Sequence, residues 1–272
     1  MAELPVRARR LAAAAVLAAL MPSARALAVV PIPRPIPMKW TIGGVERRAL
    51  VYPPAIGRGR PAPAVFAFHG HGGNLRQAAR EMQIQDSWPE AVVVYLQGLP
   101  TPTAVDPKGR FPGWQRVRGE EGDRDLTFFD EALADVRTRW RIDPDRIYAV
   151  GFSNGAIFTY LLWAERAPVF AAFAACAGKI WPPTTPSVPK PLVAIGGERD
   201  RVLPLAEQRE SIRAACRIDG CLPKPRRCGP MCLAHRSSRG APVETWIHPG
   251  GHVFPPWAGA AVVRFFRDHP RR

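Results

Sequence analysis

The sequence predicts an α/β domain with a mostly parallel sheet and helices on both of its faces. Short apolar segments alternate with segments of helical periodicity through most of the 272 residues. The apolar segments are hydrophobic throughout rather than at every second residue, which is typical of strands covered on both faces. A chain of this length can bury the core of one large domain, which we expect over residues 40–272.

The first 26 residues have the three parts of a secretory signal peptide. Arginines 7, 9 and 10 precede an unbroken apolar run at residues 11–20, and residues 24–26, "ARA", offer small side chains for cleavage. The run is too short to span a bilayer, although an uncleaved interfacial helix is an alternative. Arg9 and Arg10 also permit twin-arginine export. We therefore expect a secreted protein, extracellular or periplasmic, without stable membrane insertion after cleavage.

The next elements lead to the first glycine-rich loop. Residues 27–39 predict an extended linker, because prolines at alternate positions exclude a helix. Gly43 and Gly44 separate two extended runs, which predicts a hairpin. We expect a buried strand at 64–68, the loop "HGHGGN" at 69–74, a helix near 75–85 and a strand at 91–96. Residues 97–124 predict a long surface loop, and such loops are often functional.

The second half continues the alternation of strands and helices. Apolar residues at helical spacing predict a helix near 126–140, with Asp125 as its N-cap. Further strands are expected at 147–150, 170–176, 192–195 and 243–248, and helices at 156–165, 205–216 and 258–268. A loop rich in Cys, Pro and Arg precedes the last strand.

Ser153 lies in the motif Gly-x-Ser-x-Gly, "GFSNG", between a predicted strand and a predicted helix. In this context a serine occupies a sharp turn where its hydroxyl is exposed, and Gly151 and Gly155 let strand and helix pass closely. The structural alternative is a serine that only caps the helix. The motif predicts that Ser153 is a nucleophile, with an oxyanion donor in the Asn154 N–H.

A serine hydroxyl needs a base and a group that orients the base. Asp200 follows the strand at 192–195, and His252 follows the strand at 243–248, in the order expected for such a site. Both positions fall at the carboxyl edge of the sheet, where α/β proteins build their sites. Glu198 is an alternative acid and His248 an alternative base; we favour His252 because two glycines precede it.

The second oxyanion donor is expected in the loop after the first core strand, and we assign it to the backbone N–H of His71. His69 is interpreted as a structural histidine that bonds the loop backbone. A metal site at His69 and His71 lacks a third ligand at suitable spacing, so no metal is predicted.

The segments "FHGHGGN", "RIDPDRIYAVGFSNGA", "GGERDRVLP" and "GGHVFPPW" occur in this order over residues 40–268. Together they resemble the secreted polyhydroxybutyrate-depolymerase-like and feruloyl-esterase-like branch of the α/β-hydrolases. The resemblance implies a carboxylic ester hydrolase in which Ser153, Asp200 and His252 form the triad. It also implies an oxyanion hole from the amides at positions 71 and 154, and no cofactor.

The sequence departs from this branch in two places. Relatives often have Cys where His71 stands, but only the backbone N–H is required there. Many depolymerases that attack solid polymer carry a separate binding domain, whereas this chain ends at Arg272. We therefore expect small-molecule or short oligomeric esters as substrates. A serine peptidase and a non-catalytic binding protein on the same scaffold are the alternative functions.

The remaining candidates are cysteines and aromatic residues. Four cysteines predict two disulfides in an oxidising compartment, with three possible pairings, or a zinc site with His235. They are Cys216, Cys221, Cys228 and Cys232, while Cys176 is expected as a buried thiol. Four loop aromatics are candidates for substrate binding: Trp114, Trp181, Phe254 and Trp257.

The charge of the chain, formally +15, does not by itself indicate a nucleic-acid partner. The basic residues are scattered, and no basic run is interleaved with aromatics as nucleic-acid sites require. We therefore expect no nucleic-acid binding.

Overall fold

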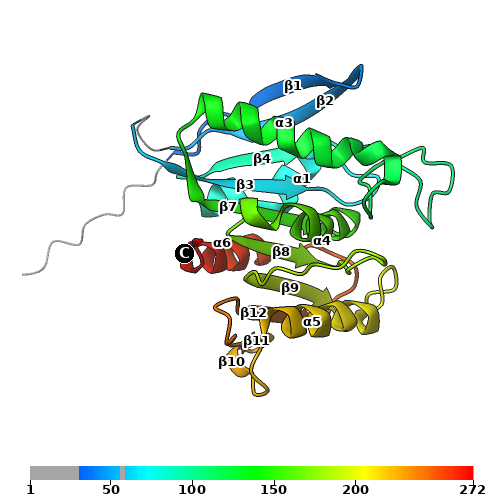
Figure 1. Ribbon diagram of the computed structural model, residues 1–272, viewed down its shortest axis with the longest axis vertical. Helices are drawn as coiled ribbons and strands as arrows, with labels where there is room; N and C mark the ends of the chain where they lie inside the picture. The colour runs from blue at the N-terminus through cyan, green and yellow to red at the C-terminus, as the bar shows by residue number, and fades with distance from the viewer. Residues whose placement is uncertain (1–30, 56–58, 272) are drawn as a thin grey trace, which may run out of the picture.

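The computed structural model describes residues 31–55 and 59–271, and its main feature is one ten-stranded sheet (Figure 1). From one margin to the other the order is β1-β2-β4-β3-β7-β8-β9-β12-β11-β10. The strands are β1 (Ile36–Ile42), β2 (Val45–Tyr52), β3 (Ala62–Phe68), β4 (Val92–Leu96), β7 (Ile142–Phe152), β8 (Ala172–Cys176), β9 (Leu192–Gly197), β10 (Arg226–Gly229), β11 (Cys232–His235) and β12 (Val243–His248).

The centre of the sheet is parallel and its two margins are antiparallel. From β4 through β3, β7, β8 and β9 to β12, every neighbouring pair is parallel. The pairs β1–β2, β2–β4, β12–β11 and β11–β10 are antiparallel. The predicted α/β class and the mostly parallel sheet are therefore confirmed, as is the hairpin around Gly43 and Gly44.

Helices cover both faces, so the sheet separates two hydrophobic cores (Figure 1). Residues of α3 (Arg124–Arg139), α4 (Asn154–Arg166) and α5 (Leu205–Asp219) belong to one core. Residues of α1 (Leu75–Met82), α2 (Ile84–Ser87) and α6 (Ala258–Asp268) belong to the other. In β3, Phe66 faces the first core and Val65 the second. This double burial explains why the central strands are apolar at every position.

Several expected boundaries differ from those of the structure, and two of the differences have a clear physical reason. Strand β1 begins at Ile36 and includes the last four residues of the predicted linker. Pro37 is tolerated there because β1 is a margin strand, where a missing N–H need not interrupt the sheet. Asp125 lies inside α3 rather than at its N-cap. Its carboxylate instead accepts hydrogen bonds from the Arg47 guanidinium at 2.7 Å and the Gln115 N–H at 2.9 Å.

The long segment between β4 and α3 is mostly irregular, as predicted, but it is anchored. It contains the small antiparallel pair β5 (Leu99–Pro100) and β6 (Pro112–Gly113), and a short 3-10 helix, η1 (Glu120–Asp123). A second 3-10 helix, η2 (Ala167–Val169), follows α4. The predicted signal peptide lies outside the described residues. Within the described ranges, no helix is both long and apolar enough to cross a membrane.

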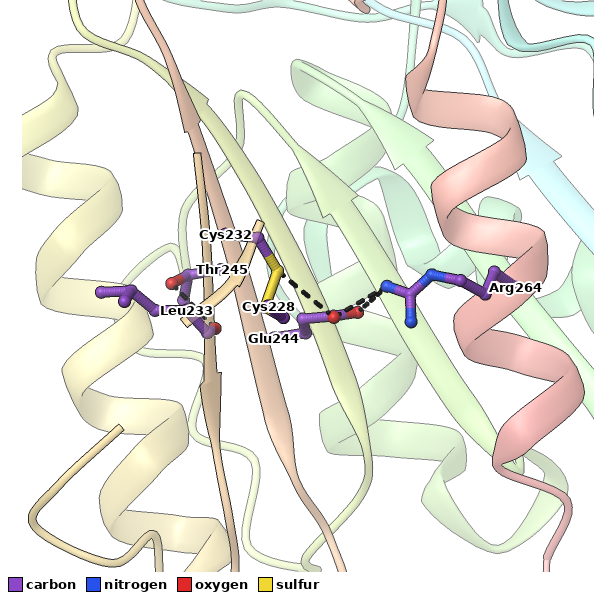
Figure 2. Close-up of a disulfide and its surroundings, with 6 residues drawn as sticks. All are labelled: Cys228, Cys232, Leu233, Glu244, Thr245 and Arg264. Carbon is purple, nitrogen blue, oxygen red and sulfur yellow. Dashed lines mark hydrogen bonds and ion pairs between the residues drawn. A yellow bond between two sulfur atoms is a disulfide. The ribbon is translucent and has the colours of Figure 1, made fainter. Parts of the chain in front are cut away.

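The cysteine-rich segment forms the hairpin β10–β11 at the sheet margin, not the predicted loop. Cys228 and Cys232 are joined across its turn, and Figure 2 shows the sulfur of Cys232 beside the carboxylate of Glu244. Glu244 is buried and accepts two hydrogen bonds of 2.7 Å from Arg264 on α6. Glu244, on β12, thus connects the disulfide of the β10–β11 hairpin to helix α6.

The predicted alternative of a zinc site with His235 is not assembled. Among residues 31–55 and 59–271, the only convergent set of ligand atoms comes from Cys228, Cys232 and Glu244, without His235. The two sulfurs are bonded to each other, and Arg264 neutralises Glu244. Cys216 and Cys221 are not joined, but their thiols are within hydrogen-bond distance of each other. Cys176 is buried, as expected.

Candidate active site

The predicted site residues meet at the carboxyl edge of the parallel strands. Ser153 follows β7, Asp200 follows β9 and His252 follows β12, while residues 69–74 follow β3. Strands β3, β7, β8, β9 and β12 are consecutive neighbours in the sheet. The loops at their ends therefore lie side by side, as expected for a site in an open α/β sheet.

Ser153 occupies a sharp turn between β7 and α4. Its φ of 55° and ψ of −120° are unusual for a residue with a side chain. The turn requires the glycines on either side. A Cβ at Gly151 would lie 2.2 Å from the Gly155 carbonyl oxygen, and a Cβ at Gly155 would lie 2.3 Å from the Phe68 carbonyl oxygen. The motif thus reflects the close approach of β7, α4 and β3.

His252 links the serine to the carboxylate. Its Nε2 lies 2.8 Å from the Ser153 Oγ, and its Nδ1 lies 2.8 Å from the Asp200 Oδ2. The Asp200 side chain is fully buried and also accepts hydrogen bonds from the N–H groups of Val202 and Leu203 and from the Gln208 amide. A carboxylate held this way can orient the imidazole and stabilise its protonated form.

The rival acid and base occupy other positions. The Glu198 side chain is exposed, and the carboxylate bonded to His252 is that of Asp200. His248 is buried, and its Nδ1 accepts a hydrogen bond from the Gly250 N–H at 3.0 Å. Burial lowers the pKa of His248. His248 therefore stabilises the turn that presents His252 rather than contacting Ser153.

The two expected oxyanion donors belong to different segments, His71 to the loop after β3 and Asn154 to the start of α4. Asn154 is the first residue of α4, where backbone N–H groups have no partner within the helix. In the other loop, the N–H of Gly72 donates to Pro112 and that of Gly73 to Gly70. The Asn154 side chain fixes the long segment between β4 and α3, because its amide exchanges hydrogen bonds of 2.7 and 3.0 Å with the backbone of Trp114.

His69 has the structural role predicted for it. It is buried, its Nδ1 lies 2.7 Å from the Gly70 carbonyl oxygen, and its Nε2 accepts the Gly98 N–H at 3.0 Å. Burial lowers its pKa to about 4, so the ring is neutral at physiological pH. The ring joins the loop after β3 to the loop after β4.

A cavity of about 480 Å³ opens beside His252. Phe152, Phe254 and Met82 contribute apolar surface, and Gln77, Glu81 and His71 contribute polar surface. Phe254 therefore lies where the sequence analysis expected a substrate-binding aromatic. The cavity can take a ligand with an apolar body and hydrogen-bonding groups.

The other three aromatic candidates do not line this cavity. The prediction for Trp114 is wrong, because Trp114 is fully buried, stacks on Phe158 and donates from its indole to the His69 carbonyl oxygen. Trp257 packs against Trp246. Trp181 is partly buried, with the Arg116 guanidinium and the Lys179 ammonium over its ring.

Two supporting residues escaped the sequence analysis. Gln208 on α5 donates to Asp200, and Asp106 of the long loop lies 3.4 Å from the His71 ring. Neither belongs to a motif with a fixed spacing, although Asp106 falls in the loop that was expected to be functional.

The strand order and the serine turn define the α/β-hydrolase fold, and solved structures confirm it. An acetyl xylan esterase from Aspergillus awamori superposes with a TM-score of 0.66 at 13% identity, over 85% of this chain and 99% of that one. A ferulic acid esterase from Anaeromyces mucronatus gives a TM-score of 0.62 at 13% identity, over 88% and 92% of the two chains. No model of a known protein family matches the sequence.

Curated sequences support the resemblance to the feruloyl-esterase-like branch. "Putative esterase NocK" of Nocardia uniformis subsp. tsuyamanensis is 30% identical over 163 residues, which are 56% of this chain and 43% of that protein. Feruloyl esterase D of Neurospora crassa is 28% identical over 189 residues, 67% and 63% of the two chains. The matches span less than two thirds of the length of these relatives.

Proposed function

We propose that the chain is a serine hydrolase of carboxylic esters. The observation that carries this proposal is the pair of 2.8 Å contacts that connects Ser153 through His252 to Asp200. The similarity of the chain to proteins named as esterases supports an ester rather than an amide as the substrate.

In the proposed reaction, the Ser153 Oγ attacks the ester carbonyl while His252 Nε2 takes the hydroxyl proton. The N–H groups of His71 and Asn154 stabilise the oxyanion. His252 then gives its proton to the leaving alcohol, and an acyl-enzyme on Ser153 remains. Water attacks the acyl group with His252 again as the base, which releases the acid and restores the serine. These steps need no cofactor or metal.

The substrate we propose is a soluble ester or a short oligomer with a compact acyl group. The mixed apolar and polar surface of the cavity suits a feruloyl or acetyl ester better than a long alkyl chain. Names of relatives support the same choice, since they include a feruloyl esterase and a bifunctional acetylxylan esterase/xylanase from Neocallimastix patriciarum, which is 31% identical over 84 residues. A depolymerase of polyhydroxybutyrate oligomers is the other member of the proposed class.

The first test is substitution of the nucleophile. Ser153→Ala should lower kcat/KM on p-nitrophenyl acetate and methyl ferulate by roughly 10⁴-fold or more, since the serine and its base act as one unit. Ser238→Ala, at an exposed serine, is the matched control and should retain full activity. His252→Ala should be as inactive as Ser153→Ala, and His248→Asn should remain active.

A p-nitrophenyl ester series from acetate to octanoate then measures the size of the acyl pocket. Equal rates for wild type and Ser153→Ala would contradict the proposed nucleophile. A fluorophosphonate probe gives an independent readout, since it should label wild type and Ser238→Ala but not Ser153→Ala.

A further inference from the structure

The side chains of His71 and Asp106 form a buried pair beside the proposed oxyanion site. The Nε2 of His71 lies 3.4 Å from the Asp106 Oδ2, and the two side chains are only 13% and 3% exposed. Within the described part of the chain, neither ring nitrogen of His71 makes an aligned hydrogen bond, and the Asp106 Oδ1 also has none. Buried polar atoms without partners cost free energy, so their presence requires an explanation.

Asp106 is fixed by its own loop. Its Oδ2 accepts the Phe111 N–H at 2.9 Å, and its backbone exchanges hydrogen bonds with Thr103. Burial raises the pKa of the Asp106 carboxyl, but the N–H groups of Phe111 and Arg110 and the nearby His71 lower it by more. The carboxylate therefore keeps its charge and its position next to the imidazole.

The same loop contacts both residues that are expected to supply the oxyanion donors. A Cβ at Gly113 would lie 2.8 Å from the His71 Nδ1 and 3.0 Å from the Asn154 Oδ1, so Gly113 packs between these two residues. The Pro112 carbonyl oxygen accepts the Gly72 N–H at 2.7 Å. His71 also lines the cavity that His252 lines. A change in the charge of His71 is therefore felt where the oxyanion would form.

We propose that His71 is a positioning residue for the oxyanion site, and that Asp106 holds its imidazole in place and favours its protonated form. This inference rests on the proposed ester hydrolysis. A protonated ring beside the backbone N–H of His71 adds positive potential where negative charge develops, in a site with little water. His71 and Asp106, whose buried polar atoms lack aligned hydrogen bonds, thus have a role that a neutral side chain at position 71 could not perform.

Other charged groups near His71 are arranged so that Asp106 dominates. Arg110 lies 3.8 Å from the Asp106 Oδ1 but is largely exposed, so solvent and salt screen it. His69 is neutral, as described above. Glu81 and His252 line the same cavity, and His252 must be neutral to act as the base. Loss of activity at acid pH through His252 is therefore expected in wild type and variants alike.

The test is the pH dependence of kcat in Asp106→Asn, which keeps an oxygen to accept the Phe111 N–H and removes the charge. We expect kcat near pH 6 to fall about tenfold, less than the 10²–10³-fold lost with an oxyanion donor itself. The ratio of wild type to variant should approach one as pH rises to 9. KM should change much less than kcat.

His71→Gln should reproduce this loss, and the double variant should lose no more than either single variant. Arg110→Gln, which removes an exposed charge next to the same carboxylate, is the matched control and should leave kcat unchanged. A kcat ratio that is constant with pH, or losses that add in the double variant, would mean that the pair only maintains the loop and would overturn the proposal.

A second measurement does not depend on turnover. Imidazole ¹⁵N spectra, with the His71 signal assigned from His71→Gln, should show the ring protonated at higher pH in wild type than in Asp106→Asn. Identical titrations would overturn the pairing even if activity behaved as expected. An inactive wild type with the expected titration difference would instead contradict the proposed ester hydrolysis while leaving the pair intact.

Discussion

At the scale of single residues, the conformation of Ser153 has a cost that its neighbours offset. A residue with a side chain at φ 55° and ψ −120° is strained by on the order of 1–3 kcal/mol. The Ser153 N–H donates to Cys176 on β8, and the Ser153 carbonyl oxygen accepts from Ala156 and Ile157 at the start of α4. The turn is therefore held by a neighbouring strand and by the helix that follows it.

Asp219 provides a pH-dependent prediction at this scale. It is fully buried at the end of α5; its Oδ1 accepts the Lys190 N–H, and its Oδ2 has no partner in the described residues. Burial raises its pKa to about 8, against smaller contributions from the Lys190 N–H and Arg239 that lower it. The folded state therefore holds a proton that the unfolded state loses near pH 4.

This difference should make the protein less stable as pH rises from about 4 to 8. Asp219→Asn keeps the acceptor for Lys190 and removes the ionisation. We expect the free energy of unfolding in urea to decline less over this range in Asp219→Asn than in wild type, with the two proteins closest near pH 4. Parallel pH profiles would contradict the assignment.

The residues whose positions could be predicted from the sequence are those that follow a strand in a recognisable order. Ser153, Asp200 and His252 follow predicted strands, and parallel strands bring such residues to one edge. Trp114 was placed wrongly because exposure depends on what packs around a loop, here Phe158 and the His69 backbone. Gln208 could not be found either, since a glutamine in the first turns of a helix has no local sign of a buried partner.

At the scale of elements, the margin hairpin β10–β11 is the main structure that the sequence analysis missed. Its two strands have four residues each and lie in a segment rich in arginine, proline and glycine. They therefore show no hydrophobic periodicity. Such short and charged strands are typical of sheet margins, where they hinder pairing with other chains. The pairing of β11 with β12 stabilises these strands, which the local sequence alone does not favour.

The four clustered cysteines give a prediction at the same scale. Cys221 donates its N–H to the Cys216 carbonyl oxygen at 2.8 Å, and their thiols already contact each other. In protein produced in an oxidising compartment we expect a Cys216–Cys221 disulfide beside Cys228–Cys232. A bond closing so short a loop should stabilise the fold by about 2 kcal/mol.

Peptide mapping without reduction checks this pairing, and Cys176 serves as the internal control because it should remain a free thiol after denaturation. A peptide linking Cys216 or Cys221 to Cys228 or Cys232 would contradict it.

At the scale of the whole molecule, the parallel centre of the sheet and the hairpin at one margin could be predicted, but the hairpin at the other margin could not. Helices between apolar strands force parallel crossover connections, which determine the centre. At the margins, Gly43 and Gly44 between two extended runs predicted the pair β1–β2, whereas the pair β10–β11 depends on contacts with no such sequence signal. The apolar strands also predicted helices on both faces of the sheet, and the two hydrophobic clusters confirm this.

At the same scale, we predict that the chain is exported and that its first 26 residues are removed. We expect protein recovered outside the cytoplasm to begin at Leu27, because cleavage after Ala26 uses the small residues at positions 24 and 26. Intact-mass analysis and N-terminal sequencing check this. Ala26→Trp should block the cleavage and leave residues 1–26 attached, and a mature wild-type protein that retains them would contradict the expectation.

The contacts of His252 join residues that are distant in the chain, with Ser153 lying 99 positions and Asp200 52 positions away. These three side chains meet only when β7, β9 and β12 are side by side in the finished sheet. In a nascent or unfolded chain, Ser153 consequently has neither the base nor the carboxylate beside it. Recovery of the proposed esterase activity after dilution from denaturant should therefore coincide with completion of the sheet, not with earlier collapse or helix formation.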